Sequence, residues 1–478
     1  MAFRQTVSRR RTEPSRCPTY RGGASEVRCP VGGSAQRFPD RLALEFDDRR
    51  WSWADVAREV DGWSAWLEGQ GLGANDRVST ITWNRPEVLF LWFALLRRGA
   101  TLVPLNARLT AAELEPLLAR VQPKLVLSTA FPSPTRGAVR EAELNEGDEA
   151  AGLFTSGTTG TPSLVPLTVG NFLASHRANA ANLGANEHQV WLGTLPLFHV
   201  GGLAMAFRWA VMGARLVLEK QFDAARVALL LRRGDLTHAS FVPTALSRVL
   251  EQPGAAFSPS LEALLIGGGP MGVELLRRAR TLRLPVLQTY GLTEACSQVT
   301  TERLSDADGT TAGPALPGLE VRIENEQGPV PVGVIGEICV RGPTVTPSAG
   351  EWLRTKDLGH LDSRGRLTVH ARRVDLIVSG GENIYPAEVE AVLSESPLVL
   401  DVAVAPMADE TWGQVPVAFV VWRGAPMAEA LDAHARARLA GFKVPRRWVT
   451  VESLPRNASG KLLRHQLPGP PFPAVTRS

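Results

Sequence analysis

The stretch from Thr155 to Pro162 has the residue types of a loop that binds an anion. It reads Thr-Ser-Gly-Thr-Thr-Gly-Thr-Pro, and the apolar runs 152–154 and 164–169 on either side predict two strands. Backbone amides and hydroxyls in a flexible loop between strands can converge on one phosphate group. The loop is not a usual P-loop, because no Gly-Lys-Ser/Thr follows at the required spacing. An ordinary hairpin loop has the same composition, so phosphate binding and a plain turn both fit this stretch alone.

Composition places the chain among globular proteins of more than one domain. Its 478 residues are enough for two or more domains, and 44% hydrophobic with 21% charged residues suits a large core. A net charge of +4 is small for this length and argues against a nucleic-acid binder. No apolar run is long enough to span a bilayer. The few, scattered cysteines lack metal-ligand spacing and favour reduced thiols in the cytoplasm.

The N-terminal head differs from the rest of the chain. It is rich in arginine and precedes any periodic hydrophobic pattern. We predict a poorly ordered basic segment over residues 1–33. It lacks the continuous apolar segment of a secretory signal, whereas a transit peptide stays open as an alternative.

The remaining chain is predicted to form a large N-terminal domain, residues 34–374, and a small C-terminal domain, residues 375–478. Strand-like runs first alternate with helical periodicity, which indicates a doubly wound α/β sheet. From residue 313, short strands between glycine and proline turns predict a small β-barrel or sheet. The last part reads β–α–β–β–α–β, the pattern of a small α+β domain. Strands are expected near 42–46, 51–53, 77–82, 100–104, 124–128, 189–193, 216–218, 239–242, 264–266, 319–323 and 336–340, and helices over 53–71, 86–98, 111–121 and 171–183.

Seven further clusters, rich in glycine or charged residues, follow one another in an order and spacing seen in a known group of enzymes. Together with the loop at 155–162 they resemble the acyl-adenylate-forming superfamily of acyl-CoA synthetases, adenylation domains and luciferases, from about residue 38 to residue 467. The resemblance implies a large domain hinged to a small mobile domain. The clusters span residues 196–202, 267–270, 288–294, 352–357, 372–375, 379–386 and 454–461.

The reaction of this superfamily requires such residue types. A carboxylate is a poor electrophile, so ATP first converts it to an acyl-AMP with release of pyrophosphate, and CoA then takes the acyl group. Two anions must be held together against their repulsion, which needs fixed positive and dipolar groups. The resemblance therefore implies a small-molecule carboxylic acid, ATP, Mg²⁺ and CoA as partners and no nucleic acid. The sequence leaves a homo-oligomer open.

The resemblance also assigns roles to nucleotide-binding residues. Glu294 would ligate Mg²⁺, Thr293 would contact the α-phosphate, and Tyr290 would stack on adenine. The alternatives are a solvated carboxylate at a helix start and core packing of the tyrosine. Asp357 and Arg372 would pair with the ribose hydroxyls. The remaining residues expected to bind the nucleotide are Thr155, Ser156, Gly157, Thr158, Thr159 and Gly160 of the loop and the glycines Gly268, Gly269 and Gly291.

Residues nearer the C-terminus would serve the two half-reactions in turn. Lys461 matches the catalytic lysine that bridges carboxylate and phosphate oxygens, and Asp375 matches the hinge. Gly380 and Gly381 would let the pantetheine arm of CoA approach the backbone closely. The basic run 443–447 fits contacts to CoA phosphates and a solvated surface equally well.

Three positions depart from the superfamily pattern. Ser163 stands where the loop usually has a lysine, Lys356 replaces the glycine of a Thr-Gly-Asp motif, and Ala371 replaces another glycine. The missing lysine removes a positive charge near the β- and γ-phosphates. We expect the activity to persist, with altered ATP affinity or pyrophosphate handling.

Within the superfamily the chain most resembles the 2-succinylbenzoate–CoA ligases of menaquinone biosynthesis. The motif 293–300, expected to begin a helix, and the run 267–271 carry this resemblance, together with Arg208 after His199. The expected catalytic residues are His199, Thr293, Glu294 and Lys461, and the expected substrate residues are His199, Arg208, Gly267 and Ser297.

Arg208 lies in a nearly apolar helical segment, where an arginine is costly to bury unless an anion meets it. A second carboxylate of the substrate would supply that anion. Snorkelling to solvent, or pairing with an internal acidic residue, is supported almost equally. A general fatty or aryl acyl-CoA synthetase is the first alternative function. A carrier-protein-loading adenylation enzyme or a non-catalytic nucleotide-binding relative is a more distant one.

Overall fold

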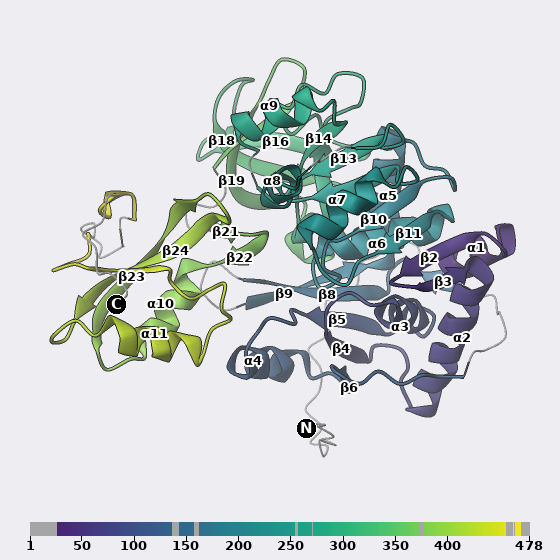
Figure 1. The fold of residues 1–478 in the computed structure, drawn as a ribbon, viewed down its shortest axis with the longest axis horizontal. Helices are drawn as coiled ribbons and strands as arrows, with labels where there is room; N and C mark the ends of the chain where they lie inside the picture. The colour runs from purple at the N-terminus through teal and green to yellow at the C-terminus, as the bar shows by residue number, and fades with distance from the viewer. Residues whose placement is uncertain are drawn as a thin grey trace.

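The computed structural model describes residues 26–135, 143–156, 162–253, 257–269, 271–371, 376–455, 462 and 464–469. Figure 1 shows a large body of two sheets with helices, a green antiparallel sheet at its top, and a yellow-green C-terminal body at its side. The C-terminal body lies next to the free ends of the blue strands β8 and β9. A site between these parts can therefore draw residues from all of them.

The first sheet of the large body has five strands in the order β6-β4-β5-β8-β9. Its strands are parallel except for β9, which pairs with β8 as an antiparallel hairpin. The loop rich in glycine and hydroxyl residues connects this hairpin, as the sequence predicts for its flanks. The strands are β4 (Arg77–Ile81), β5 (Thr101–Leu105), β6 (Leu125–Leu127), β8 (Glu149–Ser156) and β9 (Pro162–Thr168), with α3 (Pro86–Leu96) and α4 (Ala111–Val121) as crossovers.

The second sheet has eight strands in the order β15-β14-β13-β12-β10-β11-β2-β3. Its six inner strands from β14 to β2 are parallel, and the two edge strands are antiparallel to their neighbours. The strands are β2 (Leu42–Phe46), β3 (Arg49–Ser52), β10 (Val190–Gly193), β11 (Arg215–Leu218), β12 (His238–Phe241), β13 (Ala263–Ile266), β14 (Val286–Leu292) and β15 (Ser297–Thr301). The helices are α5 (Val169–Leu183), α6 (Val200–Met212), α7 (Ala224–Arg232), α8 (Pro243–Leu250) and α9 (Val273–Thr281).

One hydrophobic core joins the two sheets through a layer of helices. It contains residues of both sheets and of α2 (Trp53–Gly69), α3, α5 and α6. Large aromatic side chains fill it: Trp53 stacks on Trp209, and Phe172 stacks on Phe207. Helix α3 is buried around its whole circumference, which explains why its sequence is strongly apolar. The predicted doubly wound α/β architecture is therefore confirmed.

The green sheet and the C-terminal body correspond to the short strands predicted from residue 313 and to the small α+β domain predicted after them. The green sheet contains β16 (Glu320–Asn325), β17 (Gly328–Pro329), β18 (Gly336–Arg341), β19 (Leu353–Leu361) and β20 (Leu367–Ala371), all antiparallel. The C-terminal body contains β21 (Ile377–Ser379), β22 (Glu382–Ile384), α10 (Pro386–Ser394), β23 (Val399–Asp409), β24 (Gly413–Trp422), α11 (Ala428–Arg436), β25 (Arg447–Thr450) and η3 (Arg464–Gln466). The sequence predicts a single strand at the start of this body. The structure has the hairpin of β21 and β22 there, because Gly380 and Gly381 turn the chain with positive φ.

Two predictions from the sequence are wrong. Residues 26–33 do not belong to a poorly ordered head: β1 (Glu26–Arg28) pairs with β7 (Glu143–Asn145), and α1 (Pro30–Arg37) packs into the main core through Val31. The motif at 293–300 does not begin an α-helix. It forms a short 3-10 turn, η1 (Thr293–Ala295), and then β15, and a second such turn is η2 (Pro347–Ala349). The predicted domain boundary at residue 375 lies outside the described residues.

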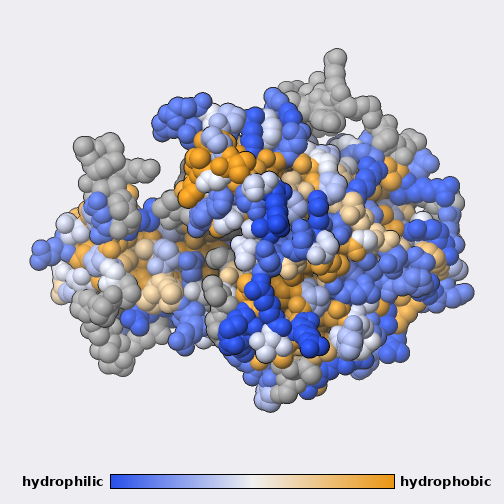
Figure 2. All heavy atoms as spheres, turned by 90° about the horizontal axis from the view of Figure 1, so that it is seen from above, coloured by the Kyte–Doolittle hydropathy of each residue, from blue (hydrophilic) through white to orange (hydrophobic). Residues whose placement is uncertain are grey.

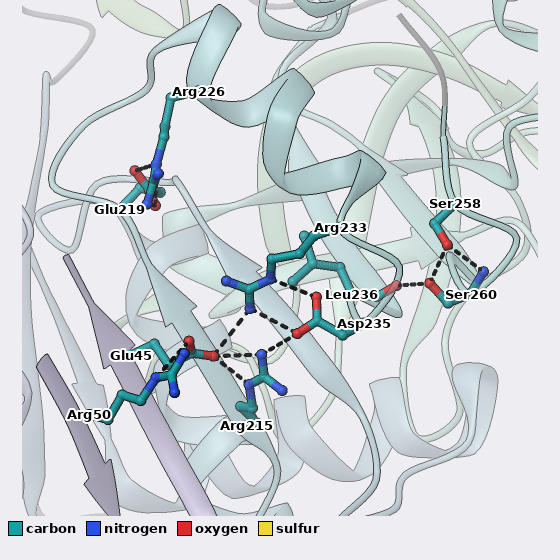
Figure 3. Close-up of polar contacts among 10 residues, drawn as sticks. All are labelled: Glu45, Arg50, Arg215, Glu219, Arg226, Arg233, Asp235, Leu236, Ser258 and Ser260. Atoms are coloured by element: carbon teal, nitrogen blue, oxygen red, sulfur yellow. Dashed lines mark hydrogen bonds and ion pairs between the residues drawn. The ribbon is translucent and has the colours of Figure 1, made fainter. Parts of the chain in front are cut away.

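Charged side chains tie the second sheet together away from its core. Glu45 on β2 accepts hydrogen bonds from Arg215 on β11 and from Arg233, and Arg50 lies 3.5 Å from it. Asp235 pairs with the same Arg215 and Arg233, as the dashed lines in Figure 3 show. This set of five residues, the Glu45 network, places three guanidinium groups around two carboxylates.

The surface gives no sign of a membrane-crossing segment in the described residues. No helix there is both long and apolar enough to cross a membrane. Figure 2 shows hydrophilic and apolar side chains interspersed over the face seen from above.

Candidate active site

A cavity of about 630 Å³ lies where the large body meets the green sheet and the C-terminal body. It opens beyond the carboxyl ends of β13 and β14, the usual place for ligands in open α/β sheets. The site residues predicted from the sequence that line it are Thr155, His199, Arg208, Gly267, Gly268, Gly291, Thr293, Glu294, Ser297, Asp357, Gly380 and Gly381. The structure thus brings together residues that are spread over more than two hundred positions of the chain.

Some predicted site residues are not placed at this cavity. Gly269 and Tyr290 do not line it, and Ser156 is described only as the end of β8. Seven others lie outside the described residues: Gly157, Thr158, Thr159, Gly160, Arg372, Asp375 and Lys461. Their roles remain predictions.

The turn between β14 and β15 forms one wall through an unusually close approach of backbone. A Cβ atom on Gly291 would lie 1.8 Å from the carbonyl oxygen of Ser297, so only glycine fits there. Cys296 and Ser297 both have positive φ angles, 49° and 90°, which residues other than glycine rarely adopt. Strained backbone of this kind is typical of functional sites, where surrounding packing holds it in place. Ser297 is consequently fixed against the cavity.

Tyr290 supports Asp357 instead of facing the cavity. Its side chain is only 3% exposed and belongs to the core of the green sheet, while its hydroxyl donates to Asp357 Oδ2 at 2.7 Å. Asp357 lines the cavity, so the tyrosine orients a carboxylate that the resemblance assigns to ribose. The core packing considered as the alternative for Tyr290 is observed, and stacking on adenine remains a prediction.

Lys356, which stands where the superfamily has a glycine, has a φ of 62°, a backbone conformation that glycine adopts at lower cost. It does not line the cavity.

Glu294 is the one candidate magnesium ligand that the sequence analysis names. Among the described residues no cluster of three or more His, Cys, Asp or Glu side chains could enclose a metal ion. Mg²⁺ is commonly held by one or two carboxylates together with substrate phosphates and water. A single glutamate on the cavity wall, next to Thr293, fits a magnesium ion that arrives with ATP. The ion would neutralise phosphate charge there.

The turn of the β21–β22 hairpin closes one side of the cavity. A Cβ on Gly380 would lie 2.6 Å from the Trp412 ring, and one on Gly381 would lie 3.2 Å from Val242. Next to them, Glu382 faces His199 with 3.3 Å between Oε2 and Nε2. Burial acts to raise the pKa of the Glu382 carboxyl, but His199 and a nearby arginine outweigh it and hold that pKa below its usual range. The C-terminal body therefore contributes an ionised carboxylate to the cavity.

The inner end of the cavity contains a buried cation without a carboxylate partner. Arg208 is 3% exposed, its Nη2 donates to Gln298 Oε1 at 3.1 Å, and its guanidinium lies over the Trp191 ring. Nε has no hydrogen-bond partner, and Arg208 forms no ion pair with a carboxylate within the described part of the chain. Burial lowers the pKa of Arg208 to about 10, which leaves it charged at neutral pH. Within the described residues Arg208 is therefore neither exposed to solvent nor paired with an acidic side chain, the two alternatives considered for it.

Neutral polar groups surround this arginine. Burial, followed by the charge of Arg208, lowers the pKa of His176 and of His238 to about 4. Asn179 Nδ2 donates to the same Gln298 oxygen at 2.8 Å. Apart from Gln298, which lies in the motif 293–300, these neighbours cannot be predicted from the sequence, because they come from separate elements. The cavity thus has a positive, largely desolvated inner end.

Comparisons with known proteins agree with this geometry. The family model described as AMP-binding enzyme matches residues 33–348, and the model of the AMP-binding enzyme C-terminal domain matches residues 388–461. The chain is 37% identical over 471 residues to 2-succinylbenzoate–CoA ligase of Bacillus licheniformis, covering 91% of this chain and 98% of that relative.

Two solved structures of o-succinylbenzoate CoA synthetase (MenE) from Bacillus subtilis, each 33% identical, resemble this fold to different degrees. A double mutant bound with its product analogue OSB-NCoA gives a TM-score of 0.87 over 93% of this chain and 98% of that one. The complex with ATP and magnesium ion gives 0.68 over 93% and 100%. The family match and these identities show that the chain belongs to the AMP-binding enzyme family.

Proposed function

We propose that this protein is an AMP-forming acid–thiol ligase that converts 2-succinylbenzoate to its CoA thioester through an acyl-AMP. The relatives with the names given above support the reaction and the acid. Within this molecule the observation that carries the choice of acid is Arg208, a buried cation at the inner end of the cavity with only neutral groups around it. 2-Succinylbenzoate has a second carboxylate that can neutralise it, whereas a fatty acid has none.

The first half-reaction requires the reacting carboxylate to meet the α-phosphorus of ATP. With one carboxylate held at Arg208, the other would extend towards Thr293 and Glu294 on the cavity wall. A carboxylate oxygen forms the bond to phosphorus, and pyrophosphate leaves. Asp357, held by Tyr290, would accept hydrogen bonds from ribose hydroxyls, and Lys461 would stabilise the developing charge.

The second half-reaction transfers the acyl group to CoA. The thiol sulfur, having lost its proton, forms a bond to the acyl carbon as the bond to AMP breaks. The hairpin turn of Gly380 and Gly381 offers a narrow backbone wall for the pantetheine arm. The larger TM-score to the complex with a product analogue, 0.87 against 0.68, supports the view that the described arrangement is the one for thioester formation.

The same proposal includes a cytoplasmic location. Three described cysteines, Cys29, Cys296 and Cys339, are free and buried, which suits a reducing compartment.

The test is thioester formation by the purified full-length protein with ATP, Mg²⁺ and CoA. The panel of acids is 2-succinylbenzoate, benzoate, octanoate and palmitate, with products identified by mass spectrometry. We expect 2-succinylbenzoate to be used far better than the monocarboxylic acids. A preference for palmitate or octanoate would replace the proposal by a general acyl-CoA synthetase, and acyl-AMP formation without a CoA thioester would favour the carrier-protein-loading alternative.

A further inference from the structure

The segment 106–113 of the large body, which follows β5 and includes the first turn of α4, is one of the parts of that body that contact the C-terminal body. Asn106 Nδ2 and Arg108 Nη1 both donate to Glu382, at 3.0 and 3.3 Å. Leu109 packs against the core of the C-terminal body, and Thr110 Oγ1 donates to the backbone oxygen of Arg438 at 2.9 Å. These contacts join the two bodies, so a rotation of the C-terminal body away from this segment would break them.

Lys443 is, with Glu382, one of the buried charges in this interface. Its ammonium group donates to Glu113 Oε1 of the large body at 2.8 Å and to Glu388 Oε1 of the C-terminal body at 2.6 Å. The Lys443 and Glu113 side chains are only 8% and 9% exposed. Burial acts to lower the pKa of Lys443, but the two carboxylates outweigh it and hold that pKa above its usual value. A buried ion pair of this kind is costly to break, because one charge is left without its partner.

This placement bears on Lys443 alone within the basic run 443–447, whose Arg446 and Arg447 are exposed. The basic run 443–447 was equally compatible with contacts to CoA phosphates and with a solvated surface. Lys443 is neither free for a phosphate nor solvated, since both of its contacts are to buried glutamates.

The two glutamates are not equivalent with respect to movement between the bodies. Glu388 lies on α10, in the same body as Lys443, so that contact survives any rigid movement of the C-terminal body. Glu113 lies on α4 of the large body, so its contact is lost whenever the C-terminal body turns away. Only the Glu113 contact therefore distinguishes one arrangement from another.

We propose that the ion pair between Glu113 and Lys443 is a positioning contact that favours the arrangement for thioester formation over the arrangement for adenylation. The inference rests on the proposed function, in which the two half-reactions use different arrangements. A contact present in one state and absent from the other shifts the populations by its full differential free energy. Neither residue lines the cavity, so the pair acts through the position of the hairpin turn at Gly380 and Gly381.

Glu113→Gln removes the charge with little change of shape. Glu113 Oε2 also accepts a hydrogen bond from the backbone amide of Thr110, and Thr110 Oγ1 accepts one from the backbone amide of Glu113, which together form the capping box of α4. Glutamine serves equally well at that position of a capping box, so α4 keeps its start. The matched control is Glu388→Gln, which alters the other contact of the same lysine within the C-terminal body.

The first measurement separates the half-reactions. Adenylation is followed by ATP–pyrophosphate exchange, and thioester formation by mixing synthetic 2-succinylbenzoyl-AMP with CoA. For Glu113→Gln we expect the thioester rate to fall about tenfold while exchange stays unchanged or rises. For Glu388→Gln we expect the ratio of the two rates to stay within about twofold of the wild type. Equal loss of both half-reactions in Glu113→Gln, or the same change of ratio in both variants, would overturn the proposal.

The second measurement does not depend on which acid the enzyme uses. Spin labels are placed at Val332→Cys in the turn between β17 and β18 and at Leu400→Cys in the C-terminal body, both exposed, with Cys17 replaced by serine. Pulsed dipolar spectroscopy then gives the distribution of distances between the bodies. We expect Glu113→Gln to reduce the population at the distance of the described arrangement and Glu388→Gln to leave it. An unchanged distribution in Glu113→Gln refutes the positioning role, whereas failure of the wild type on every acid refutes only the proposed function.

Discussion

Two regions of this molecule place arginine side chains next to buried polar groups, and they differ in how the arginine charge is neutralised. In the Glu45 network, Arg215 and Arg233 reach Glu45 and Asp235, and each carboxylate contacts more than one guanidinium (Figure 3). At the inner end of the cavity, Arg208 meets an amide oxygen and an indole ring. Where the protein supplies a carboxylate for each arginine, as in the Glu45 network, no ligand is needed to explain why the arginine is there. A buried charge left among neutral groups lowers stability unless an anion arrives, and that asymmetry separates a structural network from a binding site.

The largest effect is expected from removing the unpaired charge. Arg208→Leu should lower kcat/KM for 2-succinylbenzoate by roughly 10²-fold, about 2–3 kcal/mol, the range for a lost charged hydrogen bond. The free energy of unfolding should stay the same or rise, because a desolvated charge is gone. Steady-state kinetics and urea denaturation of the same preparation test both statements. Activity on octanoate or benzoate should be intact or improved, and equal loss for all acids would contradict a role in recognising the second carboxylate.

The opposite pattern is expected in the Glu45 network. Glu45→Gln should lower the free energy of unfolding by about 2 kcal/mol, because three arginines lose a buried charged acceptor that is 8% exposed. Its kcat/KM for 2-succinylbenzoate should not change. Urea denaturation gives the stability. The control is Glu219→Gln, which alters a more exposed pair with Arg226 and should cost less than about 1 kcal/mol. A large loss of activity in Glu45→Gln would show that the two regions are not independent.

A smaller effect is expected from the amide that holds Arg208. Gln298→Leu should lower kcat/KM for 2-succinylbenzoate about tenfold, since it removes the acceptor of Arg208 and Asn179 without removing the charge. The measurement is a double-mutant cycle with Arg208→Leu. Because Gln298 acts on the substrate carboxylate through Arg208, the loss should disappear when Arg208 is already leucine. Additive losses in the double variant would place Gln298 in direct contact with the substrate.

The sequence predicts the parts of this site that local chemistry dictates. The run that forms α3 and the segment of α6 that carries Arg208 are recognisable as almost wholly apolar. Gly291 is recognisable from the motif 288–294, and the structure gives the reason for it, since no other residue fits beside Ser297. The family motifs place Asp357 and Glu294 on one cavity although they are distant in the chain. These features are visible because each depends on residues close in sequence or on a motif whose partners recur together.

Other features depend on tertiary contacts that no local pattern contains. Val31 is buried only because α1 packs on α2 and α6, so the arginine-rich composition before it misled the prediction for residues 26–33. The contact of Lys443 with Glu113 joins positions 330 residues apart, and a basic run gives no indication of it. Tyr290 could be assigned neither to the core nor to the cavity before its hydroxyl was seen on Asp357.

The smallest effect expected concerns pH, and it compares the same two regions once more. The pKa values of His176 and His238 lie near 4 in the folded protein, below the ordinary value of 6.5. Between these values the unfolded chain binds protons that the folded chain does not, so this contribution to stability is complete above about pH 6.5 and is lost as the pH falls towards 4.

Burial is the larger cause of the lowered histidine pKa values, and the charge of Arg208 is the smaller one. Arg208→Leu should therefore raise both pKa values only slightly and make the loss of stability between about pH 6.5 and about pH 5 slightly less steep. Urea denaturation at several pH values measures this slope, and Glu45→Gln, whose site contains no histidine, should keep the wild-type slope over the same interval. A steeper slope in Arg208→Leu would mean that the arginine does not repel the protonated imidazoles, and the view of an unpaired positive charge at the inner end of the cavity would have to be abandoned.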